Sequence, residues 1–197
     1  MMQRTHPISA LLVLSTVISI ALGCQSTRSA NYYVLVAVPP AQVPSGDAAE
    51  GALVVVDPIV LPGYLERPQL VSRGNPGELN LSHDERWSED LSENASRVLA
   101  DDLAERIPSD RVGVLQPGSP QRGGTRLRVE ISRFERGTDD GVELVARWSL
   151  RRQGESEPHL TRRSTLRVAT EGSETADTVR AMSQALAHLA DEIRRAL

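Results

Sequence analysis

The side chains that most often ligate metals or catalyse hydrolysis are sparse and scattered in this sequence. His83-Asp84-Glu85 is its one dense group of metal-ligating residue types. Consecutive residues point in different directions, so they rarely chelate a single ion. The sequence contains no G-x-S-x-G, H-E-x-x-H or calcium-loop motif. We therefore expect no catalytic residue, no metal site and no cofactor.

Basic residues are unusual in kind, because all 22 of them are arginines. Without lysine, neither a G-x-x-x-x-G-K phosphate loop nor a Schiff-base enzyme is possible. The formal net charge of −4 and an aromatic content of 3% argue against nucleic acid as a partner.

Many arginines fall within three consecutive predicted strands, and two interpretations of them remain open. One is a surface that binds anionic lipid headgroups or an acidic partner. The other is a polar sheet face balanced by glutamates on the same strands. The arginines concerned are Arg126, Arg128, Arg147, Arg151, Arg152, Arg162, Arg163 and Arg167, and the glutamates are Glu130, Glu135, Glu143 and Glu155.

Cys24, the only cysteine, follows an apolar run of about 15 residues that is too short to span a membrane comfortably. Residues 1–23 have the order of a signal peptide, with a charged start, an apolar run and small residues at the end. The sequence Ala21-Leu22-Gly23-Cys24 resembles a bacterial lipobox, which implies cleavage before Cys24 and attachment of a diacylglyceryl group to its sulfur, with palmitate among the expected acyl chains. Gln25 in the next position resembles the pattern sorted to the outer membrane.

Residues 24–31 are then expected to form the lipidated cysteine and a short polar linker. Seven residues, 25–31, reach only about 24 Å, so the folded domain should lie close to its membrane. The domain itself is assigned to residues 32–197.

Hydrophobic periodicity predicts an α/β domain with a mixed sheet packed against at least two helices. Helical spacing is clear over residues 91–107, with Asp90 as the cap, and over residues 174–197. Within the first helix, Asp101-Asp102 is interpreted as part of a solvated face. Strands are expected at 32–38, 52–60, 69–72, 78–82, 111–115, 127–132, 142–150 and 160–169, with 69–82 forming a hairpin and GTDDG at 137–141 forming a turn.

The segment Leu61–Arg73, LPGYLERPQLVSR, is the least generic part of the chain. Loops of this composition often carry function, and Tyr and Arg are frequent in interface hot spots. We expect Tyr64, Arg67, Gln69 and Arg73 to contact a partner. The alternative is structural: Tyr64 and Leu65 would plug the domain's own core, and Arg67 would bond backbone carbonyls.

This segment, followed by Arg86-Trp87-Ser88-Glu89-Asp90-Leu91 and a helix, resembles the PqiC-type ABC transport auxiliary lipoproteins. Tyr32-Tyr33-x-Leu35, soon after the cysteine, is similar as well. The resemblance adds Trp87 to the candidate contact residues and implies a three-layer sandwich similar to the N-terminal domain of TolB.

The resemblance also implies a function that is not enzymatic. Such proteins are anchored in the outer membrane, face the periplasm and assist an MCE-domain protein and an inner-membrane permease. These systems move lipids or other hydrophobic molecules and support envelope integrity; a homo-oligomer is a further expectation. The other hypotheses are a structural or assembly lipoprotein of another envelope complex, and an enzyme.

Overall fold

The computed structural model describes residues 29–41, 53–107, 112–114 and 124–197. The predicted signal peptide and Cys24 lie outside these residues. The elements are β1 (Asn31–Tyr33), β2 (Val54–Val56), β3 (Gln69–Arg73), β4 (Leu79–Trp87), α2 (Leu91–Ala104), β5 (Val112–Val114), β6 (Thr125–Arg136), β7 (Gly141–Arg152), β8 (Leu160–Ala169) and α3 (Thr175–Arg194).

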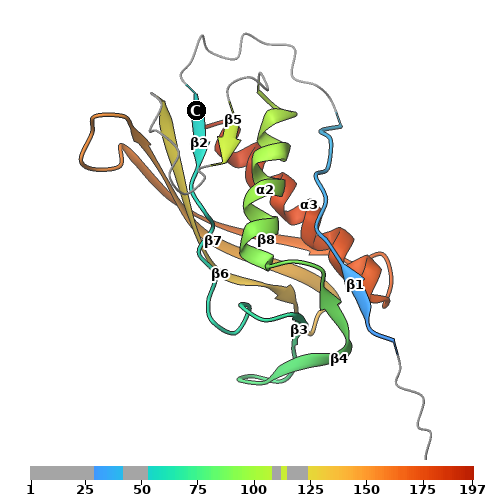
Figure 1. The fold of residues 1–197 in the computed structure, drawn as a ribbon. Helices are drawn as coiled ribbons and strands as arrows, with labels where there is room; N and C mark the ends of the chain where they lie inside the picture. The colour runs from blue at the N-terminus through green and yellow to red at the C-terminus, as the bar shows by residue number, and fades with distance from the viewer. Residues whose placement is uncertain (1–28, 42–52, 108–111, 115–123) are drawn as a thin grey trace, which may run out of the picture.

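The strands form one mixed sheet around the long strand β6 (Figure 1). One edge of β6 pairs along its length with β7, which pairs in turn with β8; both pairings are antiparallel. The other edge is shared, because β2 pairs in parallel with the start of β6 and β3 meets its end at Ser72 and Arg136. The loop between β2 and β3 must therefore pass along the middle of β6.

Strand alternation divides the β6–β8 sheet into an apolar face and a charged face. Leu127, Val129 and Ile131 of β6 are buried, while Arg128 and Glu130 between them are exposed. This pattern is expected for a sheet with one face toward the core. The pairing register shifts between Ile131 and Arg133, so Phe134 enters the core beyond that irregularity.

The helices α2 and α3 pack against each other and bury the apolar face (Figure 1). Asp90 caps α2 by accepting hydrogen bonds from the backbone N–H groups of Ser92 and Glu93, as the sequence predicts. In α3 the apolar stripe, including Leu186 and Ile193, is fully buried. The predicted mixed α/β sheet packed against two helices is confirmed.

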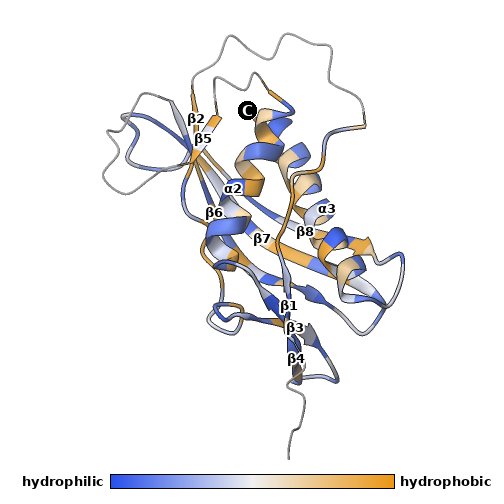
Figure 2. Ribbon diagram, turned by 45° about the vertical axis from the view of Figure 1, so that its right-hand side comes forward, coloured by the Kyte–Doolittle hydropathy of each residue, from blue (hydrophilic) through white to orange (hydrophobic). Residues whose placement is uncertain are grey.

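The predicted strand over residues 32–38 is only partly correct. Only Asn31–Tyr33 joins the sheet, beside β4, and the rest runs as an extended segment between α2 and α3 (Figure 2). Leu35 in this segment is 1% exposed. We call residues 34–38 the strap; in Figures 1 and 2 it lies on the side of the helices away from the sheet.

Helix side chains, rather than another strand, satisfy the backbone of the strap. The N–H of Leu35 donates to Asn94 Oδ1 at 2.7 Å, and that of Val38 donates to Asp102 Oδ1 at 2.8 Å. Ser183 of α3 accepts from the N–H of Val36 at 3.2 Å. The expectation that Asp102 lies on a solvated face is therefore wrong. Its side chain is buried beneath the strap and accepts the hydrogen bond from Val38.

The other predicted strands and helices are present with shifted ends. The strand expected over 52–60 is reduced to Val54–Val56 and an isolated bridge from Val60 to Glu130. Pro58 has no N–H, and the N–H of Ile59 donates to Ser96 Oγ of α2 instead of to a strand. No helix in the described ranges is long and apolar enough to cross a membrane.

Candidate functional site

The segment between β2 and β3 is held by two buried leucines. Leu61 and Leu65 are 5% and 3% exposed, and both belong to the hydrophobic core. Between them the backbone turns, with the N–H of Leu65 donating to the carbonyl of Pro62 at 2.8 Å. This turn places the side chain of Tyr64 over the charged side of the sheet near the end of β6.

Tyr64 meets Glu135 of β6, a carboxylate that is completely buried in spite of its charge. The Tyr64 hydroxyl donates to Glu135 Oε2 at 2.7 Å, and the backbone N–H of Phe134 donates to the same oxygen at 2.8 Å. Arg73 Nε donates to Glu135 Oε1 at 2.8 Å, and its guanidinium lies 5.9 Å from the centre of the Tyr64 ring. A buried carboxylate needs such donors, because without them its desolvation would be very costly.

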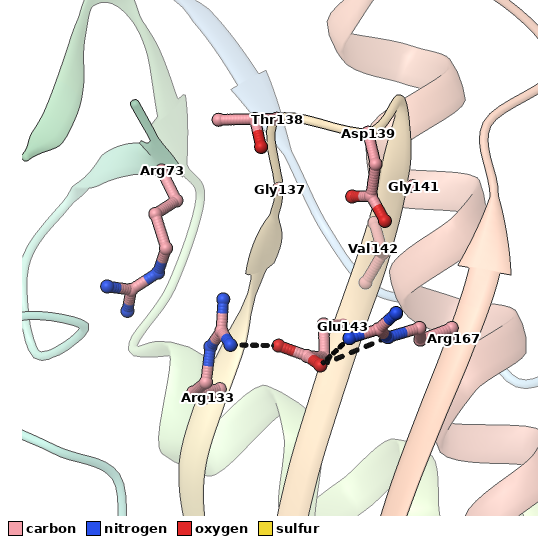
Figure 3. A pocket seen from close by; sticks show the side chains of 9 residues that line it. All are labelled: Arg73, Arg133, Gly137, Thr138, Asp139, Gly141, Val142, Glu143 and Arg167. Carbon is pink, nitrogen blue, oxygen red and sulfur yellow. Dashed lines mark hydrogen bonds and ion pairs between the residues drawn. The ribbon is translucent and has the colours of Figure 1, made fainter. Parts of the chain in front are cut away.

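Glu143 of β7 lies directly opposite Glu135 in the β6–β7 pairing and extends the ionic network. It pairs with Arg133 on one side, and on the other it accepts from Arg167 Nε and Nη2 at 3.1 and 3.0 Å (Figure 3). Arg133 also reaches Glu135 at 3.4 Å. The two glutamates and the arginines around them form one continuous network, which we call the Glu135–Glu143 network.

A cavity of about 240 Å³ opens above this network, beside the β6–β7 turn (Figure 3). Its walls are the side chains of Arg73, Arg133, Glu143 and Arg167, together with Gly137, Thr138, Asp139, Gly141 and Val142 of the turn and the start of β7. Arg133 and Arg167 in this lining already bind Glu143, and Arg73 binds Glu135.

The electrostatics of the network favour its present protonation states. Burial, followed by the hydrogen bond to Glu135, raises the pKa of Tyr64 well above its usual value, so the hydroxyl stays protonated and donates. The hydrogen bond to Glu135 also raises the pKa of Arg73. The network can therefore hold the loop and the sheet together, but it offers no free base or nucleophile.

The five candidate contact residues do not all come together. Tyr64 and Arg73 meet at Glu135, whereas Trp87 is 6% exposed and packs in the core at the end of β4. Gln69 lies opposite Arg86 in the β3–β4 pairing. The Nε atom of Arg67 is buried without a hydrogen-bond partner in the described residues, and so is that of Arg86.

The sequence predicts Glu135 and Glu143 only as counter-charges to the arginines, whereas both residues are buried. Their spacing contains a signal, since each lies four residues from Asp139 at the centre of the predicted turn. A hairpin with that centre places the two carboxylates opposite each other, where like charges are destabilising unless cations lie between them. Two neighbouring arginines, Arg133 and Arg167, supply those cations.

No group of three histidine, cysteine, aspartate or glutamate side chains in the described parts of the chain is arranged to hold a metal ion. His83 instead lies 2.7 Å from Asp84, with its ring almost fully exposed.

A comparison with protein-family models decides the family. Residues 33–194 match the ABC-type transport auxiliary lipoprotein component. The chain belongs to this family. The resemblance seen in the sequence is confirmed, and it implies a membrane-anchored protein that assists an ABC-type transport system.

Solved structures of two proteins share the fold of this auxiliary lipoprotein. An uncharacterised protein is 19% identical, with a TM-score of 0.68 over 85% of this chain and 97% of its own. A protein from Xanthomonas campestris, described as a member of the DUF330 family, is 16% identical, with a TM-score of 0.63 over 83% and 92% of the two chains. At these identities the likeness concerns the fold alone. Comparison with curated proteins gives no match.

Proposed function

We propose that this chain is the outer-membrane-anchored auxiliary component of an ABC-type system that transports lipids or other hydrophobic molecules. In this proposal it faces the periplasm and works with an MCE-domain protein and an inner-membrane permease, without catalysing a reaction. The family match over residues 33–194 carries the proposal, because the family is described by its auxiliary role in transport. The lipobox-like sequence at Cys24 and the Gln25 that follows support the anchoring.

The partner-binding surface in this proposal is the segment Leu61–Arg73. Tyr64 and Arg73 hold the segment on the sheet through Glu135, and Trp87 supports it from the core. Arg67 and Gln69 are then the residues that contact the partner. Arg67 and Gln69 are both partly exposed, so their side chains are within reach of another protein, which supports this role.

Co-purification tests both the function and this surface. The tagged full chain should recover the MCE-domain protein and the permease from the organism's own membranes. Arg67→Ala should reduce that recovery with little change in melting temperature, because no hydrogen bond of the Arg67 Nε is lost. Arg180→Ala, which removes an exposed arginine on α3, is the matched control and should recover the partners as the wild type does.

Recovery of a different envelope complex by the wild type would contradict the transport role. If Arg67→Ala melted at a lower temperature and still recovered the partners, Leu61–Arg73 would be a structural loop only. If the partner is instead a second copy of this chain, the wild type should self-associate and Arg67→Ala should lose that self-association.

A further inference from the structure

The charged side of the β6–β8 sheet carries a patch of arginines, and the Glu135–Glu143 network accounts for only two of them, Arg133 and Arg167. Strand pairing places side chains from all three strands on this side, facing away from α2 and α3. We call the patch the arginine face and define it by Arg128, Arg133, Arg147, Arg163 and Arg167. Arg162, which the sequence grouped with these residues, instead lies over the Trp148 ring at 5.9 Å.

Carboxylates balance only part of the arginine face. Glu143 pairs with Arg133 and Arg167, as described above. Glu130 lies opposite Arg147, but its carboxylate binds Arg128, at 3.1 Å from Nε and 3.0 Å from Nη2.

The central two arginines, Arg147 of β7 and Arg163 of β8, face each other directly across the strand pair. Both are exposed, and neither has a carboxylate partner within the described ranges of the chain. Like charges in directly opposed positions destabilise a sheet, so folding alone does not favour this pair. Their position is better explained by an anionic ligand that binds both guanidinium groups.

The surroundings of this pair favour lipid headgroups over a protein partner. Ser149, Thr161 and Thr165 occupy the neighbouring outward positions, and all three are small and polar. Val145, the apolar residue opposite Thr165, is 5% exposed and cannot serve as a contact. Protein interfaces depend on large apolar or aromatic anchors at their centre, whereas arginine binds phosphate groups through charge and paired hydrogen bonds alone.

We propose that the arginine face binds the phosphate groups of anionic phospholipids at the surface of the membrane to which the protein is anchored. The family is one of lipoproteins, so the domain works beside a membrane. The face extends along the strands to Arg167 and the β6–β7 turn. At this end of the sheet β6 meets β3, β3 pairs with β4, and β4 pairs with β1 (Figure 1). Because β1 is the first strand after the linker, this end of the arginine face lies on the side of the domain where the linker enters. The proposal does not depend on which molecule the system transports.

Vesicle flotation tests the proposal with the full-length chain carrying Cys24→Ala, so that no acyl chain contributes to binding. Vesicles of phosphatidylcholine alone measure binding through the remaining apolar residues, and vesicles that also contain phosphatidylglycerol measure the contribution of anionic lipid. The protein should bind the anionic vesicles more tightly, and high salt should abolish the difference. Arg147→Gln together with Arg163→Gln should weaken binding to anionic vesicles about 30-fold.

The matched control is Arg97→Gln together with Arg180→Gln, which removes two exposed arginines from the helices on the other side of the sheet. It changes the net charge by the same amount and should bind as the parent protein does. Equal binding to neutral and anionic vesicles would overturn the proposal and favour an acidic protein partner for the arginine face. Equal losses in the two double variants would also overturn it, because net charge rather than this face would then control binding.

Discussion

At the scale of single residues, the clearest feature is a fully buried glutamate that gains its donors from distant parts of the chain. Glu135 binds the hydroxyl of Tyr64, the guanidinium of Arg73 and the backbone of its own strand. Two residues of the segment Leu61–Arg73, Tyr64 near its start and Arg73 at its end, therefore bind the same carboxylate. The hydrogen bond from Tyr64 to Glu135 favours the structural interpretation of Tyr64, in which its side chain holds the loop on the domain. In the proposed interface, Arg67 and Gln69 are then the residues that contact the partner.

Tyr64→Phe tests the structural contribution of this hydroxyl. The ring is kept, but Glu135 loses the donor at 2.7 Å while it remains buried. We expect the free energy of unfolding to fall by about 1–3 kcal/mol, measured by urea denaturation. Tyr32→Phe is the control, since Tyr32 is 65% exposed and its loss of a hydroxyl should leave stability unchanged. Equal stability of both variants would show that Glu135 does not need Tyr64.

At the scale of elements, the strap is held to the helices in an unusual way. Its N–H groups bind side chains of Asn94, Asp102 and Ser183 rather than a strand. Arg106, itself buried, binds the carbonyl of Val38 at 3.2 Å and the carboxylate of Asp191 at 2.7 Å. The strap directly follows β1, so these few side chains determine how the start of the domain is fixed.

Asp102 should make the stability of the strap depend on pH. Burial raises the pKa of Asp102 to about 7, against the smaller opposing effects of the Val38 N–H and of Arg106; Asp101 and Asp191 also raise it. A carboxyl whose pKa is higher in the folded state binds more protons there, so its contribution to stability is lost as the pH rises from about 4 to about 7.

Asp102→Asn should remove this dependence, because the amide oxygen still accepts from Val38 and carries no charge. Relative to the wild type, the variant should gain on the order of 2 kcal/mol of stability at about pH 8 and gain little at about pH 5. Melting curves at the two pH values measure the difference, and Asp101→Asn, on the exposed neighbour, should show a much smaller change, because Asp101 only adds to the effect of burial on Asp102. A gain that is equal at both pH values would contradict the assignment.

The elements also show which parts of the fold the sequence could predict. The β6–β8 strands and the α3 helix follow from alternating and helical patterns, because each has one face in the core and one in solvent. The strap has the same alternation as a strand, with Leu35 inward and Val34 and Val36 outward. Nothing local in the sequence indicates that its backbone partners are helix side chains such as Asn94, which are distant in the chain.

The candidate site was predictable to a similar extent. Composition singled out the segment of Tyr64 and Arg73, but their meeting point is Glu135, more than 60 residues further along the chain. The burial of that carboxylate depends on β2 and β3 sharing one edge of β6, which no local pattern reports. Tertiary pairing, rather than residue type, therefore separates Glu135 from the exposed Glu130 of the same strand.

At the scale of the whole molecule, the apolar and charged sides of the sheet have different tasks. The helices cover the apolar side of the sheet and the strap lies on their outer surface, which stabilises the domain. The opposite side carries the Glu135–Glu143 network and the arginine face. If Cys24 is acylated, a linker of seven residues holds this domain within about 24 Å of the membrane, so the arginine face is within reach of lipid headgroups.

Cys24→Ala tests this arrangement in cells. Acyl chains attached to Cys24 would provide stable anchoring, which a single chain would not, so the variant should lose fatty-acid labelling and accumulate as a precursor or a soluble species. Its domain should melt as the wild type does, because Cys24 precedes the family region at 33–194. Ser26→Ala, two residues further on, is the matched control and should keep both the label and the membrane fraction. If the wild type takes up no labelled palmitate and Cys24→Ala still fractionates with the outer membrane, another part of the chain anchors the protein, and the short-tether argument for the arginine face fails with it.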